Sequence, residues 1–451
     1  MLLLILLLLT LAPSALADDH PKVIDAIFQP LAIPGSPGCA VGVLHKGETA
    51  TKGYGMADLE QHIPITPQSR FYMASVSKHF TAMAALLAEQ EGKLSLDDPL
   101  TKHIPEMPAY ASAITLRRML DHTAGLRDYL ALWGLKGWST NSVLRPEPTL
   151  SLVARQKALD FAPGQDHSYS NTGYFLMALV IERATGKNLN DYLQEKLFVP
   201  LGMKATRFQH DHSDPVPNRA HGHARSGDGW KIHDTSFDLA GSGGLYLNVE
   251  DMLVWARNFE DPKIGAKLLP ALAVIGKLND GRPTPNGYAL GLRRTTENGQ
   301  LMISHSGGAI GYRTFFARWP DHHLAIVTLC NGDANPEVLT RRLAARIIGT
   351  PEPKSPAAPT PAGKPAASAA HSKLTGVYWS EELETIWRIV DDHGALVLEN
   401  EGGRQPVTID PSGAYRAGSA EIHLRQDTSG ATTSLSVSTG RAHDIFFSRR
   451  Q

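Results

Sequence analysis

The sequence predicts an α+β fold, in which helices flank an antiparallel sheet, followed by a small all-β domain. Strand-like runs near residues 38–55 and 300–330 enclose a helix-rich middle, and short alternating runs follow a Pro/Ala-rich stretch near the end. An early strand pair and a later strand group can share one antiparallel sheet covered by helices. We therefore expect residues 18–350 to fold as one unit, with the middle segment inserted as a helical lobe.

The balance of charges excludes one class of partner. The chain has 451 residues, 44 basic and 45 acidic, and a formal net charge of −1. That length provides material for more than one domain and a large core. The basic excess that characterises nucleic-acid binders is missing, so we expect no nucleic-acid partner. A small-molecule or peptide substrate fits better, and the oligomeric state stays open.

The N-terminal residues 1–17 read "MLLLILLLLTLAPSALA", an apolar stretch that ends in a small-x-small pattern at Ala15-Leu16-Ala17. Such a stretch is typical of a signal peptide and is short for a membrane span. We expect cleavage after Ala17, an exported protein that is periplasmic or secreted, and no membrane span afterwards. An uncleaved N-terminal anchor is the alternative.

The chain has only two cysteines, Cys39 and Cys330, which excludes a disulfide scaffold and a cysteine-based zinc site. Cys39 opens the run "CAVGVLHKG" and Cys330 closes the run "LAIVTLC". Antiparallel pairing of these two strands would bring the sulfurs together, and an oxidising compartment would allow a disulfide. Two buried free thiols are the alternative.

Residues 351–372 separate the two predicted domains. Proline and alanine dominate this segment and large apolar residues vanish, which indicates a semi-rigid linker. After it, "ALVLEN", "EIHLRQ" and "TSLSVST" alternate apolar with polar residues between turn-forming clusters. Residues 373–451 are therefore predicted to form a small all-β domain.

The stretch "SVSKHFTAMAALLAEQEGKLSL" places Ser75 at the start of a helix, three residues before Lys78. The helix N-terminus favours developing negative charge, and Lys78 lies on the same face. A desolvated lysine can take the proton of a serine and make it a nucleophile. Serine is also a common N-cap, so the pair alone is a weak signal.

The second stretch, "FAPGQDHSYSNTGYFLMALVIERATG", leads through a turn into Tyr169 and Asn171 and then into an apolar helix. A phenol and an amide two residues apart in a loop can both face one cleft. The phenol would serve as proton shuttle and the amide as hydrogen-bond donor. Tyr246 and Asn248 repeat this spacing within strand-like sequence, and we interpret them as structural.

The third stretch is "SHSGGAIGY", in which His305, Ser306, Gly307 and Gly308 end a strand. Glycine at a sheet edge lets a substrate backbone approach closely. The N–H groups of Gly308 and Ser75 could form an oxyanion hole.

These three elements in this order resemble the serine β-lactamase and penicillin-binding superfamily. The relevant branch contains class C β-lactamases, His-Thr-Gly type D,D-carboxypeptidases, D-aminopeptidases and β-lactamase-like esterases. The stretches "GKLSLDDPLTKHIPE", "RRMLDHTAGL", "FVPLGMKAT" and "GSGGLYLNVEDM" extend the resemblance over most of residues 30–335. The final domain resembles the lipocalin-like C-terminal domains of some D-aminopeptidases, and its role stays open.

The resemblance implies a role for each residue of the motifs. Ser75 would be the acylated nucleophile and Lys78 its activator. Tyr169 would protonate the leaving group and activate water, and Asn171 would orient the substrate and Lys78. The segment from His305 to Gly308 would bind substrate, with Ser306 as a hydrogen-bond donor.

His305 departs from the Lys-Thr-Gly motif of β-lactamases. A lysine there binds a substrate carboxylate, whereas a histidine is mostly neutral at pH 7. The sequence therefore predicts a serine hydrolase of small amides, D-amino-acid peptides or esters, including cell-wall fragments. A β-lactamase and a slowly turning over penicillin-binding sensor are the alternatives, and aminopeptidase, carboxypeptidase and esterase activity are not distinguished.

No metal or cofactor is expected. The histidines of "QHDHSDPVPNRAHGHARS" lie in a polar, Pro-containing stretch typical of a solvated loop. The superfamily that the chain resembles needs no metal. His122, in "DHTAGL", is interpreted as part of a supporting turn.

Overall fold

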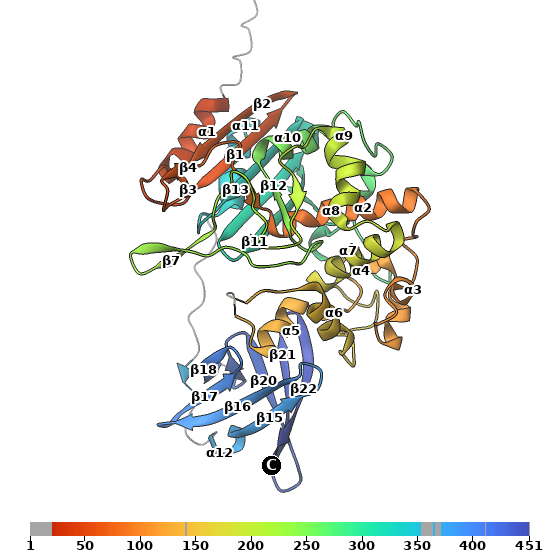
Figure 1. The fold of residues 1–451 in the computed structure, drawn as a ribbon, viewed down its shortest axis with the longest axis vertical. Coiled ribbons are helices and arrows are strands. Elements are labelled where there is room, and N and C mark those ends of the chain that lie inside the picture. The colour runs from red at the N-terminus through yellow and green to blue at the C-terminus, as the bar shows by residue number, and fades with distance from the viewer. Residues whose placement is uncertain (1–19, 140–141, 353–363, 366–370, 411, 451) are drawn as a thin grey trace, which may run out of the picture.

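Two segments far apart in the sequence join in one six-stranded antiparallel sheet (Figure 1). The computed structural model describes residues 20–139, 142–352, 364–365, 371–410 and 412–450. The order of the sheet is β10 (Arg293–Glu297), β11 (Gln300–Ala309), β12 (Tyr312–Trp319), β13 (Leu324–Cys330), β1 (Cys39–His45) and β2 (Glu48–Tyr54). The predicted meeting of N- and C-terminal strands is confirmed.

Both faces of this sheet are covered by helices, because alternate residues of its strands point to opposite sides. In β1, Cys39, Val41 and Val43 belong to one apolar cluster, and Ala40 and Leu44 to another. The first cluster includes side chains of α1 (His20–Phe28) and α11 (Pro336–Ile348). The second includes side chains of α2 (Lys78–Gln90) and α10 (Val249–Asn258).

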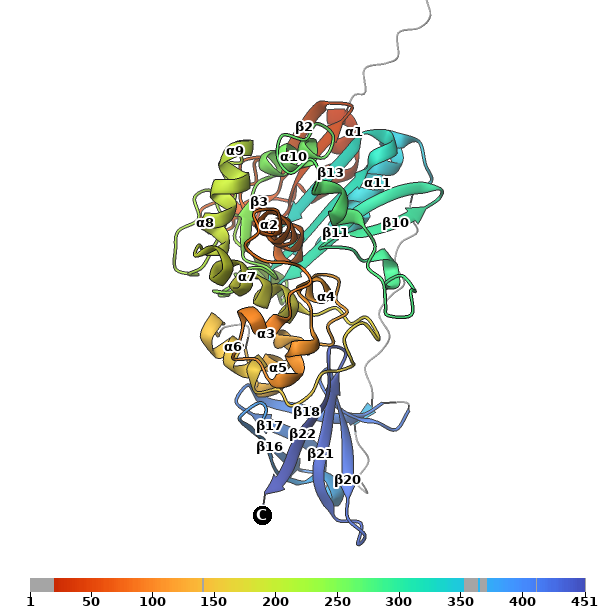
Figure 2. The same cartoon turned by 90° about the vertical axis from the view of Figure 1, so that its right-hand side faces the viewer.

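A helical lobe is inserted between the two halves of the sheet (Figures 1 and 2). It contains α3 (Leu100–His103), α4 (Leu116–Leu120), α5 (Tyr129–Lys136), α6 (Pro146–Ala154), α7 (Asn171–Thr185), α8 (Leu189–Leu193) and α9 (Val199–Leu201). Short strands complete this domain: β3 (Met56–Asp58) with β4 (Ile63–Pro64), β5 (Phe71–Tyr72) with β9 (Leu245–Leu247) and β6 (Arg207–Phe208), and β7 (His223–Ser226) with β8 (Gly229–Ile232).

The C-terminal domain is a closed barrel in which each strand pairs with the next along the chain. Its eight strands are β15 (Gly376–Ser380), β16 (Thr385–Asp392), β17 (Ala395–Asn400), β18 (Gly403–Ile409), β19 (Tyr415–Ala417), β20 (Ala420–Gln426), β21 (Thr432–Thr439) and β22 (Ala442–Arg450). Pairing of β22 with β15 closes the ring. The short β14 (Lys364–Pro365) adds to β18, and α12 (His371–Leu374) precedes β15.

The barrel and the helical lobe share an apolar core. Leu132 and Leu135 of α5 and Leu152 of α6 belong to the same cluster as the interior of the barrel. The indole N–H of Trp387 donates to the Leu135 carbonyl at 2.8 Å. A closed barrel with its own interior thus also supports one side of the lobe.

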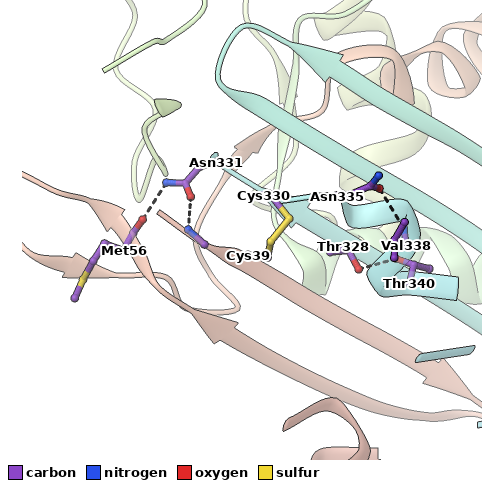
Figure 3. Close-up of a disulfide and its surroundings, with 9 residues drawn as sticks. Cys39, Met56, Thr328, Cys330, Asn331, Asn335, Val338 and Thr340 are labelled. Atoms are coloured by element: carbon purple, nitrogen blue, oxygen red, sulfur yellow. Dashed lines mark hydrogen bonds between the residues drawn. A yellow bond between two sulfur atoms is a disulfide. The ribbon is translucent and has the colours of Figure 1, made fainter. Parts of the chain in front are cut away.

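A disulfide joins the two halves of the central sheet (Figure 3). Cys39 and Cys330 lie directly opposite each other on β1 and β13, with their Cα atoms 4.1 Å apart. Beside them, the Asn331 side chain accepts from the Gly38 N–H and donates to the Met56 carbonyl. The sequence left the choice between disulfide and free thiols open, and the structure contains the disulfide.

Two sequence predictions fall wholly or largely outside the described residues. The predicted signal peptide, residues 1–17, lies outside the described residues, as does most of the predicted linker, 351–372. The domain boundaries stay predictions. None of the helices in the described part of the chain is long and apolar enough to cross a bilayer.

Candidate active site

Ser75 lies in a tight turn that leads into a buried helix. Residues Ala74–Ser77 form a 3₁₀ turn that continues directly into α2. Ala74 has a φ of 47°, a conformation that is strained for a non-glycine residue and frequent at active sites. Ser75 does not cap the helix, because the hydroxyl at the N-cap belongs to Ser77 and donates to the Ala74 carbonyl at 2.6 Å. The Ser75 hydroxyl instead faces a cleft.

Lys78 is fully buried beneath Ser75 and makes three polar contacts. Its Nζ lies 3.1 Å from Ser75 Oγ, 2.8 Å from Asn171 Oδ1 and 2.7 Å from the Ser242 carbonyl oxygen. Burial lowers the pKa of Lys78 well below its usual 10.5, and the Asp128 carboxylate only partly opposes this effect. Burial therefore favours the neutral amine over the ammonium.

In the neutral form of Lys78, these three contacts take distinct roles. A neutral amine has two N–H donors and one lone pair, whereas an ammonium has three donors. Two of the three neighbours, Asn171 Oδ1 and the Ser242 carbonyl, can only accept. They occupy the two N–H groups, so the lone pair is left for the Ser75 hydroxyl. This arrangement suits Lys78 to remove the serine proton.

Tyr169 adds a second proton-transfer group. Its ring lies 5.0 Å from Lys78 Nζ, and its buried hydroxyl has no hydrogen-bond partner among the residues placed by the structure. Burial raises the pKa of Tyr169 well above 10, while the nearby Ser75 hydroxyl and the Arg441 guanidinium act in the opposite direction. The phenol is protonated at pH 7 and can act as a proton donor.

Asn171 is held by a residue that the sequence motifs did not reveal. It begins α7, and its backbone N–H and side-chain amide both donate to Asp128 Oδ2 at 2.7 Å. Asp128 also caps α5, because its Oδ1 accepts from the N–H groups of Leu130 and Ala131. One carboxylate thus fixes the amide of Asn171 so that its oxygen faces Lys78.

The segment from His305 to Gly308 lies on β11 at the cleft. Pairing with β10 ends at Ser304, so the following residues have no strand on that side. Ser306 and Gly308 line the cleft together with His305. Gly307 faces the other way, toward the Met73 carbonyl and the Thr314 hydroxyl, where a Cβ atom would not fit. Gly307 therefore lets the strand approach the turn that carries Ser75.

His305 is neutral and committed to protein contacts. Burial lowers the pKa of His305 to about 3, and the nearby Lys78 contributes a smaller effect in the same direction. Its Nδ1–H donates to the Ser306 carbonyl at 2.6 Å, which leaves Nε2 to accept from the Tyr288 hydroxyl at 3.2 Å. His305 therefore does not supply the positive charge that a lysine would bring to this position.

Sequence reasoning missed four other residues of the site. Ser242 lies in the glycine run "GSGG", which signals an irregular backbone, and Asp128 follows the "DHTAGL" turn. Arg293 and Arg441 also line the cleft. No local signal marks Arg441, because it comes from a different domain.

The residues interpreted as structural have structural contacts. His122 Nδ1 accepts from the Ser170 N–H at 3.2 Å, and its ring packs 4.2 Å from that of Tyr169. Tyr246 is buried in β9, and the Asn248 side chain caps α10. His122 thus supports the loop between Tyr169 and Asn171.

The clustered histidines contact different carboxylates. His212 Nδ1 lies 2.9 Å from Asp238 Oδ1, and His221 Nδ1 lies 2.6 Å from Asp234 Oδ2. Within the described ranges, Asp211, His212 and Asp238 are the group whose ligand atoms lie close enough to hold a metal ion, all within 4.8 Å of one another. They do not line the cleft of Ser75.

Comparison with known proteins agrees with this site. Penicillin-binding protein 4* of Bacillus subtilis (strain 168) is 26% identical over 374 residues, covering 77% of this chain and 80% of the relative. A D-aminopeptidase of Cereibacter sphaeroides is 27% identical over 393 residues, covering 86% of this chain and 72% of the relative. The octameric penicillin-binding protein homologue from Pyrococcus abyssi has a similar fold, with a TM-score of 0.66 and 20% identity over 96% of this chain and 100% of that chain.

The family model described as Beta-lactamase matches residues 24–350. This range contains the sheet, the helical lobe and all three motifs that line the cleft. The chain belongs to the Beta-lactamase family, within the superfamily of serine β-lactamases and penicillin-binding proteins.

Proposed function

We propose that the chain is an exported serine hydrolase that forms an acyl-enzyme at Ser75 and acts on small amides, D-amino-acid peptides or esters. One observation carries the proposal: Lys78 Nζ lies 3.1 Å from Ser75 Oγ, and the Asn171 and Ser242 carbonyl oxygens are placed to accept from the two N–H groups of a neutral amine. Its lone pair is thereby available as a general base.

The residues of the cleft support a two-step reaction. Lys78 accepts the Ser75 proton as Oγ attacks the substrate carbonyl, and the N–H groups of Ser75 and Gly308 stabilise the oxyanion. Tyr169 donates its proton to the departing amine or alkoxide. Water then attacks the acyl-enzyme and returns a proton to the Tyr169 phenolate, while Lys78 returns its proton to Ser75 as the ester breaks.

The substrate class and the export rest on separate observations. Two relatives that resemble most of the chain are a penicillin-binding protein and a D-aminopeptidase, which supports D-amino-acid derivatives as substrates. The apolar stretch at residues 1–17 and the Cys39–Cys330 disulfide support export, since disulfides persist in oxidising compartments.

A substrate panel tests the proposal. We would assay D-alanyl amides, D-alanyl-D-alanine peptides, p-nitrophenyl esters and nitrocefin on the wild type, on Ser75→Ala and on the control Ser112→Ala, a change at an exposed serine. Ser75→Ala should lose more than about 10³-fold in turnover. Intact-mass spectrometry should find a fluorophosphonate adduct on the wild type and on Ser112→Ala, and no adduct on Ser75→Ala.

Each other outcome has a defined meaning. Retention of turnover by Ser75→Ala contradicts the acyl-enzyme mechanism. Rapid nitrocefin hydrolysis alone would identify a β-lactamase. A stable β-lactam adduct without turnover of any substrate would instead identify a penicillin-binding sensor.

A further inference from the structure

The turn between the last two barrel strands reaches the cleft that contains Ser75. Thr439 of β21 pairs with Ala442 of β22, so Gly440 and Arg441 form the turn. Arg441 lines the same cleft as Ser75. Figure 2 shows β21 and β22 rising from the barrel to the helical lobe. The C-terminal domain thus contributes a side chain to the site of the other domain.

Hydrogen bonds to the lobe hold this turn in place. The Arg441 carbonyl accepts from the Asp128 N–H at 2.8 Å, and the His443 N–H donates to Asp160 Oδ1 at 2.8 Å. Asp128 is the residue whose carboxylate orients Asn171. The position of the turn is therefore set by the same residue that organises the floor of the cleft.

The charge of the cleft is positive. The Arg441 side chain is exposed, and it forms no ion pair with a carboxylate among the described residues. Arg293 is a second arginine on the cleft, and its described lining includes no aspartate or glutamate. Two guanidinium groups without an acidic partner attract an anionic ligand and repel an ammonium group.

Arg441 lies beside Tyr169, the proposed proton donor to the leaving group. Its guanidinium carbon lies 4.8 Å from the centroid of the Tyr169 ring. A planar guanidinium binds a carboxylate through two parallel hydrogen bonds. His305, which stands where β-lactamases carry a lysine, has both ring nitrogens committed to protein partners.

We propose that Arg441 binds the free carboxylate of a peptide's C-terminal residue. The C-terminal domain would thereby select carboxypeptidase substrates over substrates that carry an ammonium group and over simple amides. The inference rests on the proposed function, because this carboxylate belongs to the amino acid released when Ser75 is acylated. The peptide C–N bond breaks, the ester to Ser75 Oγ forms, and the released amine takes its proton from Tyr169.

A matched pair of substrates tests the inference. We would compare kcat/KM for N-acetyl-D-alanyl-D-alanine with that for its C-terminal amide in the wild type, Arg441→Gln, Arg441→Glu and the control Arg388→Gln. Arg388 is an exposed arginine of the same barrel that does not line the cleft. The wild type and the control should prefer the free acid. Arg441→Gln should lower the acid-to-amide ratio about 10- to 100-fold, chiefly through KM, and Arg441→Glu should lower it further.

A protection assay gives the same answer without turnover. An uncharged fluorophosphonate labels Ser75, and D-alanine should protect wild-type protein at concentrations at least about tenfold lower than D-alaninamide does. Arg441→Gln should remove this difference, and Arg388→Gln should keep it.

Failure of this inference can be distinguished from failure of the proposed function. Absence of labelling on wild-type Ser75 contradicts the acyl-enzyme itself. Normal labelling combined with equal use of acid and amide, or with an undiminished acid preference in Arg441→Gln, overturns the role of Arg441. If Arg293→Gln lost the preference for the free acid and Arg441→Gln kept it, the carboxylate would bind to Arg293. This result would also overturn the role of Arg441.

Discussion

Oδ2 of Asp128 accepts hydrogen bonds from both the backbone N–H and the side-chain amide of Asn171, each at 2.7 Å. The other oxygen accepts from the first turn of α5. One carboxylate therefore ties the starts of α5 and α7 together and turns the Asn171 oxygen toward Lys78.

Replacing this carboxylate by an amide should damage both stability and activity. In Asp128→Asn, one end of the side chain becomes an N–H donor facing N–H donors, so hydrogen bonds are lost at one helix start. We expect the free energy of unfolding to fall by about 1–3 kcal/mol in urea titrations. Turnover of a p-nitrophenyl ester should fall about 10- to 100-fold as Asn171 and Lys78 shift. The exposed Asp321→Asn serves as control, and equal behaviour of the two variants would disprove this role.

The pH dependence of turnover should report the buried lysine. Only neutral Lys78 can accept the serine proton, and burial lowers its pKa well below 10.5. Turnover should therefore be lost as pH falls through that lowered pKa and be retained above it. Because burial raises the pKa of Tyr169 above 10, the proton donor should persist through moderately alkaline pH.

Lys78→Arg tests the same assignment. Arginine stays charged throughout this pH range, so the variant should lose on the order of 10³-fold in acylation rate. The exposed Lys93→Arg should keep the wild-type profile. An acidic limb that persists unchanged in Lys78→Arg would assign the titration to another group.

The disulfide should stabilise the protein against unfolding. Cys39 and Cys330 are separated by 291 positions in the sequence, so their bond closes a long loop of the unfolded chain. Reduction should lower the free energy of unfolding by about 2–5 kcal/mol. Urea titrations with and without dithiothreitol measure this change, and a Cys39→Ala/Cys330→Ala variant should not respond to the reductant. Two free thiols in protein that is unfolded without reductant would contradict the bond.

A buried ion pair between the helical lobe and the barrel should stabilise the protein. Arg127 Nη1 lies 2.7 Å from Glu382 Oε1, and both side chains are nearly fully buried. Glu382→Ala leaves a buried guanidinium without this partner and should lower stability by about 3 kcal/mol. The adjacent Glu381 pairs with Lys157 on the surface, so Glu381→Ala should change little. Similar effects of the two variants in urea titrations would count against the buried pair.

Local patterns were sufficient for much of the fold and for the nucleophile. Helical spacing after Ser75 and alternation in the C-terminal segment depend on neighbours in sequence, and both elements form as expected. Ser75 starts the helical segment without being the N-cap of α2, because the chain enters α2 through a strained 3₁₀ turn at Ala74 that propensity does not encode. The functional assignments of the motif residues stay predictions.

The sequence by itself determined the order of the motifs, the mixed fold and the all-β character of the last domain, because each rests on short-range periodicity. Only the tertiary structure decided the lowered pKa of Lys78, the cross-strand disulfide, the hydrogen bonds from Asn171 to Asp128 and the position of Arg441 at the cleft. Burial shifts a pKa through desolvation, and desolvation depends on residues far apart in the chain. A cleft that is lined by residues of two domains likewise depends on residues far apart in the chain.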